Sequence, residues 1–557
     1  MSDAPTVSPG SASPSTEAAV LRAEIARRRT FAIIAHPDAG KTTLTEKLLL
    51  YSGLLRTAGM VKNRKGGKMA TSDWMAMEQE RGISITASAM QFQYKGHVIN
   101  VLDTPGHQDF SEDTYRTLTA ADSAIMVLDA AKGVEVQTRK LFAVCKLRGI
   151  PVLTFINKCD LPGRDPLELL TEVEDVLGIQ ASAINWPIGS GRDFVGVAER
   201  DSKQMLVFEK MAAAGAARAG MRKLALDDPA ALALIGQERL AKLAEDLEML
   251  AVAGNPFSRE AFLAGQITPV FFGSALTNFG IEPFYDAFVD IAAAPSARLA
   301  DVLPPAADGR RTELRIDPVE MPFSAYVFKI QANMDPRHRD SLAFIRICSG
   351  RFDRDVVVKH FHRGEFVREV RLSRPTTLVA RERTTLDAAY PGDVVGLVNS
   401  GFAIGDTIAV ISGKIQFEHK PLPSFPPEVF ARVSPIDLGR RKAFDKGLTQ
   451  LATEGAVQIL RSAHNPMADP FVAAVGRLQF EVLQYRLKDE YAVETRLEPL
   501  PFSCSGWLVG DPTTFAPTPA TTLAVDSRGR PVALFPSEWD RNYCARQNPQ
   551  HSFVEYA

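Results

Sequence analysis

In the first half of the chain, short apolar runs alternate with stretches of helical periodicity. The apolar runs are near-continuous and have the length of buried strands: FAIIA (31–35), HVINVLD (97–103), SAIMVLD (123–129), PVLTFIN (151–157) and TPVFFGSA (268–275). Because a turn or a helical stretch follows each run, the pattern predicts a doubly wound, mostly parallel sheet covered by helices. We assign this α/β domain to residues 25–296, with an Ala/Leu/Glu-rich helical insertion at about 200–255.

The rhythm changes after a proline-rich segment at 293–319. Residues 315–415 contain short alternating segments separated by turn residues, which predicts an antiparallel β-barrel. A second proline-rich joint, HKPLPSFPPE (419–428), precedes a β-α-β-β-α-β pattern over 425–500, typical of a ferredoxin-like α+β domain. Residues 501–557 show no clear period and are taken as a C-terminal extension of unknown role.

Composition narrows the class of protein only a little. The 557 residues carry a net charge of −2, with 45% hydrophobic and 23% charged residues, as in ordinary globular proteins. The five cysteines form no C-x-x-C pair, which argues against a disulfide framework or a zinc site and fits a reducing compartment. No apolar run approaches the roughly 20 residues that span a bilayer. The Ser/Pro/Ala-rich residues 1–24 predict a disordered tail and not a secretory signal, so we expect a cytoplasmic protein.

The stretch AHPDAGKT (35–42) lies between the first strand and a helix and has the form of a phosphate-binding loop whose first glycine is replaced by Ala35. Gly40 would allow close backbone approach, Lys41 would reach the β- and γ-phosphates, and the Thr42 hydroxyl would bind Mg²⁺. On its own the motif also fits an ordinary strand–turn–helix. The candidate nucleotide-binding residues here are Ala35, His36, Pro37, Asp38, Ala39, Gly40, Lys41 and Thr42.

Three further motifs, each at the end of an apolar strand, decide between these interpretations. In DTPGH (103–107), Asp103 is placed to reach Mg²⁺ through water and Gly106 to offer its N–H to a γ-phosphate. In NKCD (157–160), Asp160 can accept hydrogen bonds from N1–H and the amine of guanine, which adenine does not offer in that arrangement. GSAL (273–276) places a backbone N–H near guanine O6. Ligands of such folds bind at the carboxyl ends of the strands, so the four motifs together predict a guanine-nucleotide site. The candidate residues here are Asp103, Thr104, Pro105, Gly106, His107, Asn157, Lys158, Cys159, Asp160, Ser274 and Ala275.

Between the first two motifs lie a basic run, VKNRKGGK (61–68), and MEQERGISIT (77–86). They fit a solvated loop or a mobile switch ordered by the γ-phosphate and Mg²⁺. Ser84 is the candidate switch ligand of Mg²⁺, with Thr86 as its rival. His107 follows Gly106 directly and is the candidate for positioning the attacking water.

Other candidate chemistry is weak. His360 and His362 alternate on one strand with no carboxylate or cysteine at ligand spacing, which predicts a surface strand and not a metal site. No Ser/His/Asp or Cys/His arrangement stands out.

The motifs AHPDAGKTT, QERGISIT, DTPGHQDFSEDTYRTL and NKCD resemble those of the translational GTPases, the group that includes elongation factor G. Within that group, Pro37, KIQANMDPRHRDSLAFIR, YPGDVVGL and EGAVQ resemble the termination branch. The resemblance covers about residues 25–500. It implies a ribosome-stimulated GTPase that drives the stop-codon-decoding release factors off the ribosome after peptide release. It also implies GTP/GDP and Mg²⁺ as ligands and no membrane or DNA partner, and we expect a monomer.

The resemblance leaves two alternatives open: an elongation factor G-like translocase, and a ribosome-binding module that uses GTP only structurally. No GGQ tripeptide suggests peptidyl-tRNA hydrolysis. No arginine finger is evident in the chain, so slow intrinsic turnover and a large effect of a partner are expected.

Overall fold

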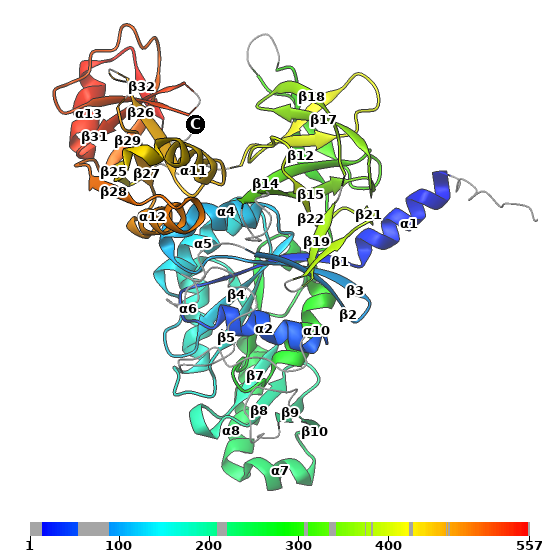
Figure 1. Cartoon of the computed structure of the whole chain (residues 1–557). Coiled ribbons are helices and arrows are strands. Elements are labelled where there is room, and N and C mark those ends of the chain that lie inside the picture. The colour runs from blue at the N-terminus through cyan, green and yellow to red at the C-terminus, as the bar shows by residue number, and fades with distance from the viewer. Residues whose placement is uncertain are drawn as a thin grey trace, which may run out of the picture.

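The computed structural model describes residues 14–53, 88–208, 220–305, 310–332, 341–373, 375–379, 382–422, 427–463, 465, 468–527 and 529–554. The candidate switch segment, including Ser84 and Thr86, lies outside the described residues. Three regions follow one another along the chain (Figure 1): the first comprises residues 14–296, the second 298–419 and the third 427–554.

The first region is built on a seven-stranded sheet of order β2-β3-β1-β4-β5-β11-β6. Only β2 pairs antiparallel, with β3, while every other neighbouring pair is parallel. The strands are β1 (Arg28–Ala35), β2 (Ser88–Tyr94), β3 (His97–Asp103), β4 (Ser123–Asp129), β5 (Val152–Asn157), β6 (Gln180–Ala183) and β11 (Ile267–Phe272). The predicted fold class, an α/β domain with a mostly parallel sheet, is confirmed.

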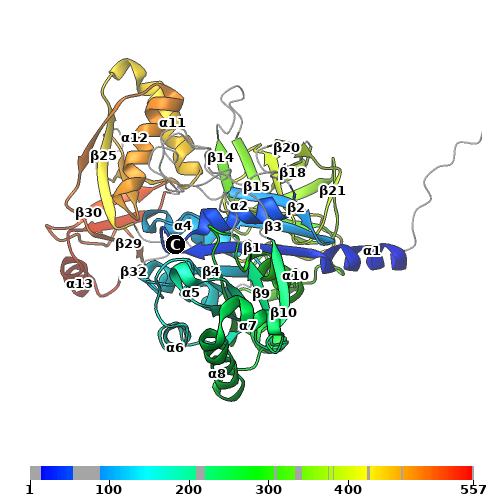
Figure 2. The same cartoon turned by 90° about the horizontal axis from the view of Figure 1, so that it is seen from below.

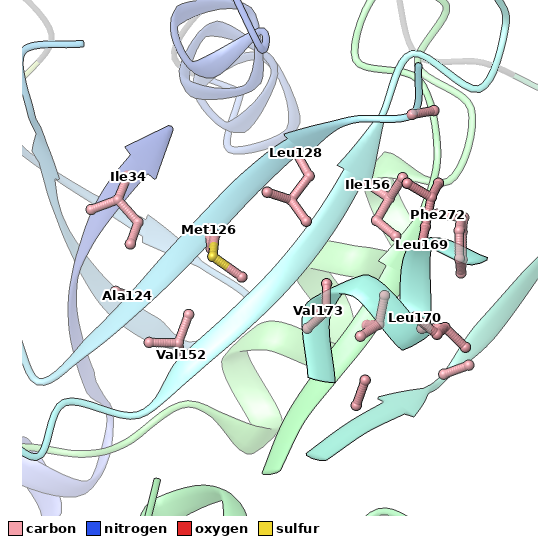
Figure 3. Packing of buried hydrophobic residues seen from close by; sticks show 14 of the residues in the cluster. Ile34, Ala124, Met126, Leu128, Val152, Ile156, Leu169, Leu170, Val173 and Phe272 are labelled. Carbon is pink, nitrogen blue, oxygen red and sulfur yellow. The ribbon is translucent and has the colours of Figure 1, made fainter. Parts of the chain in front are cut away.

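Helices cover both faces because alternate residues of each strand point to opposite sides. Phe31 and Ile33 of β1 pack with helices α2 (Lys41–Tyr51) and α10 (Ile281–Ile291). Ile34 belongs to the opposite core, under helices α4 (Ser111–Thr119), α5 (Val136–Leu147) and α6 (Pro166–Leu177). Figure 3 shows part of that core, to which Met126 and Leu128 of β4, Ile156 of β5, and Leu169 and Val173 of α6 contribute.

The insertion at about 200–255, expected to be helical, contains two strands as well as helices, and these strands pair with two others that come just before residue 200. A four-stranded sheet of order β10-β9-β8-β7 comprises β7 (Asn185–Ile188), β8 (Gly196–Glu199), β9 (Gln204–Phe208) and β10 (Met221–Ala225). Helices α7 (Pro229–Ile235), α8 (Gln237–Ala253) and α9 (Arg259–Leu263) follow. The helical prediction missed the strands because Ala- and Leu-rich residues downstream dominate the composition of this stretch.

Part of the segment predicted as a disordered tail is helical. Helix α1 (Pro14–Ala26) protrudes from the start of β1 (Figure 1). Glu24, near its end, pairs with Arg27 and Arg28 at 2.9 and 2.5 Å. The Ala/Leu/Glu content of this stretch favours a helix, and these ion pairs link it to the sheet.

The second region consists of antiparallel strands, as predicted. Its main sheet has the order β18-β17-β23-β14-β15-β22-β19-β20, and β12, β13 and β24 form a smaller sheet. The strands are β12 (Arg298–Leu303), β13 (Glu313–Ile316), β14 (Ser324–Ala332), β15 (Ser341–Ser349), β16 (Phe352–Asp353), β17 (Val357–His362), β18 (Glu365–Arg371), β19 (Thr376–Val379), β20 (Glu382–Thr385), β21 (Ala388–Ala389), β22 (Val394–Val398), β23 (Thr407–Ala409) and β24 (Gln416–His419).

The third region begins with the predicted β-α-β-β-α-β order: β25 (Val429–Pro435), α11 (Arg441–Thr453), β26 (Gln458–Ser462), β27 (Phe471–Ala474), α12 (Arg477–Tyr491) and β28 (Thr495–Pro499). The stretch after residue 500 is not separate from this sheet. Its strands β29 (Cys504–Val509), β30 (Thr522–Asp526), β31 (Pro531–Phe535) and β32 (Ser552–Val554) continue it in the order β28-β25-β27-β26-β30-β31-β29-β32, with helix α13 (Glu538–Gln547) alongside.

Buried polar contacts join the first and second regions. Asp122, just before β4, accepts hydrogen bonds from Arg298 at 2.9 Å and Arg346 at 2.6 Å. Asp393 accepts from Gln91 of β2 at 2.9 Å and forms an ion pair with Arg28 of β1 at 2.9 Å. The third region lies against the first through α12, close to α4 (Figures 1 and 2).

Candidate functional nucleotide site

Five loops meet at one edge of the seven-stranded sheet. Strands β1, β3, β4, β5 and β11 run parallel, so their carboxyl ends face the same way. The four predicted motifs follow four of these strands, and the fifth loop follows β4 at Asp129. The structure therefore brings the predicted residues of all four motifs to one edge, as expected for a ligand site of this fold.

The phosphate loop, residues 35–42, has the backbone form that its sequence requires. Gly40 has φ +102°, and a Cβ placed there would lie 2.1 Å from the Asn157 Nδ2. Only glycine fits such a position. Ala35, by contrast, is the last residue of β1 and packs in the core under α2 with 1% of its surface exposed. Its methyl group therefore fills core space, and the missing first glycine leaves no defect in the loop.

Lys41 and Asp103 form a buried ion pair at the start of α2. The Lys41 Nζ lies 2.5 Å from the Asp103 Oδ1, and the two residues are 7% and 2% exposed. Thr104, the next residue, donates its hydroxyl to the Ile33 carbonyl at 2.7 Å, which ties the DTPGH loop to β1. The first-turn N–H groups of α2 have no intrahelical acceptor and give this end a partial positive charge.

Asn157 joins three of the loops. Its Nδ2 donates to the Ala39 carbonyl in the phosphate loop at 2.8 Å, and its Oδ1 accepts the Ala275 N–H in the GSAL loop at 2.9 Å. The residue is 2% exposed. Each loop is therefore held in register with the other two by one buried amide.

Asp160 has the features expected of a group that awaits a partner. Its Oδ1 is buried and has no hydrogen-bond partner among the described residues. A buried acceptor without a donor costs about 1–3 kcal/mol. An N–H-bearing ligand at this point would remove that cost, and guanine offers two such groups.

Lys158 has φ +68° and donates from Nζ to the Asp129 Oδ2 at 2.8 Å. Burial opposes ionisation of Asp129, but the Lys158 ammonium and the Ala131 N–H outweigh it, so the pKa of this carboxyl is lowered. The pair fixes the Lys158 stem across the edge where the base is expected. Asp129 was not among the predicted residues, although it closes an apolar strand as Asp103 does.

Cys159 contributes through its backbone. Its N–H donates to the Gly273 carbonyl at 3.2 Å, which joins the NKCD and GSAL loops. Burial raises the pKa of its thiol to about 12, so the side chain stays protonated and inert.

In the GSAL loop both candidate N–H groups already have acceptors. Ser274 donates to the Phe279 carbonyl at 2.8 Å and Ala275 to Asn157. Contact of either group with guanine O6 therefore requires a shared hydrogen bond, and the assignment of this role to Ser274 or Ala275 stays a prediction.

His107 follows β3, which β1 and β4 separate in the sheet from β5, the strand that precedes Asp160. Asp109 approaches its Nδ1 with both its N–H, at 3.2 Å, and its Oδ1, at 3.3 Å. Gly106 lies against Pro37, since a Cβ at Gly106 would be 3.8 Å from the Pro37 Cα. The loop that carries His107 is thus packed directly on the phosphate loop. Asp109 was not among the predicted site residues, although it lies within the stretch DTPGHQDFSEDTYRTL that carries the family resemblance.

The two histidines of β17 differ from the surface strand predicted for them. His360 is 2% exposed, and its Nε2 lies 2.6 Å from the Asp406 Oδ2, while the His362 Nδ1 lies 2.5 Å from Oδ1. The carboxylate comes from 44 residues further on, which spacing along the strand could not indicate. Among the described residues there is no group of three or more His, Cys, Asp or Glu side chains that could hold a metal ion.

Three family models match successive parts of the chain. Residues 26–294 match the "Elongation factor Tu GTP binding domain", residues 322–411 match "Elongation factor G domain 2", and residues 419–545 match "Class II release factor RF3, C-terminal domain". The fold and the loops at its sheet edge thus define a GTPase of the translational class, which binds a guanine nucleotide.

Curated relatives specify the branch of that class. Three proteins named peptide chain release factor 3 are similar over nearly the full length: 52% identity with that of Synechocystis sp. (96% of this chain, 95% of the relative), 51% with that of Synechococcus elongatus (95% and 93%) and 51% with that of Cyanothece sp. (96% and 96%). The chain belongs to the peptide chain release factor 3 family and is a GTPase of translation termination. The predicted resemblance is confirmed.

A crystal structure of a protein from Thermus thermophilus has a similar fold, with a TM-score of 0.66 at 21% identity over 90% of this chain and 72% of that one. No helix among the described residues is both long and apolar enough to cross a membrane.

Proposed function

We propose that this protein hydrolyses GTP on the ribosome after peptide release and thereby drives the stop-codon-decoding release factors from it. The observation that carries the nucleotide part is the sheet edge where Asn157 ties three loops together and leaves the Asp160 Oδ1 buried without a partner among the described residues. Membership in the release factor 3 family supports the termination part.

Guanine is bound at the NKCD end. Asp160 accepts hydrogen bonds from N1–H and the amine, Asn157 maintains the loop geometry, and the Lys158 stem covers one face of the base. Cys159, Ser274 and Ala275 complete the pocket with backbone groups, with Ser274 or Ala275 sharing its N–H with O6.

The phosphates are bound at the phosphate loop. The backbone of residues 35–42 (Ala35, His36, Pro37, Asp38, Ala39, Gly40, Lys41 and Thr42) surrounds them, with the positive end of α2 beneath. Lys41 exchanges its ion pair with Asp103 for the β- and γ-phosphates. Breaking a buried pair leaves both charges uncompensated unless a new counter-charge arrives. A polyphosphate would supply the new counter-charge for Lys41, and a cation would supply it for Asp103.

Mg²⁺ fits this end because the side chains there offer the oxygen ligands that it prefers. Thr42 and Ser84 would hold it directly and Asp103 through water. When bound, Mg²⁺ neutralises charge on the phosphate oxygens.

Hydrolysis proceeds by in-line attack of water on the γ-phosphorus. Gly106 directs its N–H at the γ-phosphate, within the loop segment Asp103, Thr104, Pro105, Gly106 and His107. The His107 imidazole orients the water once the ribosome orders the segment around it, and Lys41 stabilises charge that develops on the transferred group.

The proposed function also implies the partners of the protein and its location. The ribosome and the decoding release factors are the partners, no membrane or DNA is involved, the protein acts as a monomer and it resides in the cytoplasm. We assign a G domain to 25–296, a β-barrel domain to 315–415 and an α+β domain that begins at 425. Because β30 pairs with β26, residues 501–554 are best grouped with this last domain.

His107→Ala tests the assigned chemistry. We expect GTP and GDP affinities near those of the unaltered protein and ribosome-stimulated turnover reduced by about 10³-fold or more. Rapid-quench measurement of phosphate release with and without ribosomes gives both rates. Equal stimulated rates in variant and parent would remove His107 from the mechanism. Absence of phosphate release from the parent would favour a module that uses GTP structurally.

A further inference from the structure

The third region contacts the loop of His107 at Asp109, in the short helix η1 (Gln108–Phe110). Its Oδ2 accepts the Leu478 N–H at 2.7 Å, at the first turn of α12. The other carboxylate oxygen lies 3.3 Å from the His107 Nδ1. Asp109 itself is 9% exposed. A single buried carboxylate therefore bridges α12 and the candidate water-orienting imidazole.

The start of α12 is shaped around this carboxylate. The Gln479 Oε1 accepts the N–H groups of Val475 and Gly476 at 2.8 and 3.2 Å, which leaves the Leu478 N–H to Asp109. A Cβ at Gly476 would lie 2.0 Å from the Asp109 Cγ. Since φ of Gly476 is −147°, an ordinary value, the close approach of Asp109 is the steric reason for glycine at this position. The positive end of the helix also favours a carboxylate here.

The contact with Asp109 involves one of the two ring nitrogens of His107. The Asp109 N–H donates to Nδ1 at 3.2 Å and the Asp109 Oδ1 lies 3.3 Å from the same nitrogen, so Nε2 is the ring nitrogen left to meet water. The ring also lies edge-on to Phe110, with centroids 6.3 Å apart. Any movement of the imidazole toward a γ-phosphate has to break or carry along the Asp109 contact, which α12 anchors.

We propose that Asp109 is a positioning residue that restrains His107 while α12 is docked, so that the third region holds down GTP hydrolysis until a partner pulls it away. The proposal rests on the role of His107 in the proposed function. It makes release of α12 part of activation, and it assigns the slow intrinsic turnover to a contact within the chain.

The test uses the full-length protein without ribosomes. Asp109→Ala removes the carboxylate that links the Leu478 N–H to His107 and leaves only the backbone N–H contact with Nδ1. We expect ribosome-free kcat for GTP to rise about five-fold or more, with KM unchanged. Asp109→Asn keeps an oxygen for the Leu478 N–H and loses the charge facing Nδ1, so a smaller rise is expected. Gly476→Ala displaces the carboxylate from the opposite side and should raise kcat as well, with no further increase when combined with Asp109→Ala.

The His107→Ala variant distinguishes release of a restraint on His107 from a general loosening of the protein. Combined with Asp109→Ala, it should return ribosome-free kcat to the level of His107→Ala alone. The matched control is Asp113→Ala: Asp113 lies on α4 and pairs with Lys329 of the second region at 3.5 Å. It should leave ribosome-free kcat unchanged. Thermal unfolding confirms that each variant is folded.

An unchanged or lower kcat for Asp109→Ala, or a rise that persists without His107, overturns the proposal. A failure of the proposed function looks different. In that case His107→Ala retains full ribosome-stimulated turnover, whatever Asp109→Ala does.

Discussion

At the scale of single residues, Asp160 and Gly40 have different roles in the nucleotide site: Asp160 is directed at a ligand, and Gly40 is required by its protein surroundings. Asp160 has a buried oxygen that the described protein does not satisfy, so its role is directed at a ligand. Gly40 has no side chain because Asn157 occupies the space where a Cβ would be. The first predicts specificity and the second predicts that the loop will not tolerate substitution.

Asp160→Asn should reverse base preference. The amide presents a donor where guanine presents its amine, whereas xanthine offers an oxygen there. One mismatched buried hydrogen bond costs about 1–3 kcal/mol, so we expect GTP affinity to fall about 10- to 100-fold and xanthosine triphosphate affinity to rise. Competition binding measures both. Asp165→Asn, at the exposed cap of α6, is the control. Retained preference for guanine would contradict the base-reading role.

Gly40→Ala should abolish nucleotide binding while leaving the second and third regions folded. The added methyl meets Asn157 at 2.1 Å and the backbone has φ +102°, so the phosphate loop and the Asn157 bridge cannot both persist. Isothermal titration with GDP measures the loss. Gly53→Ala shares a positive φ but has open space around it, and it should bind GDP normally.

At the scale of elements, sequence patterns predicted five strands of the main sheet, β1, β3, β4, β5 and β11, and the motifs that follow four of them, but not β2 or β6. They succeeded because buried parallel strands are continuous apolar runs and because each loop motif is local. The stretch after residue 500 escaped prediction for a related physical reason. Strands β29 and β31 face cores on both sides, with Trp507 in one and Leu508 in the other. Such strands lack the apolar–polar alternation that marks a half-exposed strand.

Strand β24 carries a buried histidine, His419, whose shifted pKa could not be predicted from the sequence. Burial, aided by the nearby charge of Arg298, lowers the pKa of His419 to about 3. Its Nε2 lies 3.2 Å from the Ser324 Oγ. An unfolded histidine has a pKa of about 6.5. Between these values the unfolded state binds the extra proton, so stability falls as the pH drops below about 6.5.

From pH 7 to pH 5, His419 should cost the second region about 2 kcal/mol of unfolding free energy. Hydrogen exchange of β14 and β24 amides at the two pH values, corrected for intrinsic rates, measures the change. In the His419→Gln variant, hydrogen exchange at the two pH values should not show this loss of unfolding free energy. An identical pH dependence in both proteins would show that His419 does not titrate on unfolding.

At the scale of the whole molecule, contacts between regions join residues that are far apart in the sequence. Asp122 pairs with Arg298 and Arg346 across 176 and 224 residues. Periodicity and local motifs contain no information on such pairings, and the same holds for Asp109 with Leu478. The regions could therefore be predicted one by one, while the contacts through which they communicate required the structure.

Asp122→Ala should loosen the first region from the second. Arg346 is 1% exposed, and removal of its carboxylate leaves an uncompensated buried charge worth about 3–5 kcal/mol. We expect a lower thermal midpoint and faster proteolysis between the regions. Asp353→Ala removes the partner of the exposed Arg351 in the second region and should cost about 1 kcal/mol or less. Equal effects of the two variants would contradict the central role of Asp122.

The proposed function is tested most directly on ribosomes that have just released their peptide and still hold a labelled stop-codon-decoding release factor. Dissociation of that factor is followed with this protein and GTP, xanthosine triphosphate or a non-hydrolysable GTP analogue. We predict fast, repeated dissociation with GTP for the parent protein, and a switch to xanthosine triphosphate for Asp160→Asn. His107→Ala with GTP should fail to support multiple rounds. Dissociation that is equally fast without nucleotide, or that never exceeds the spontaneous rate with GTP, would contradict the proposed function.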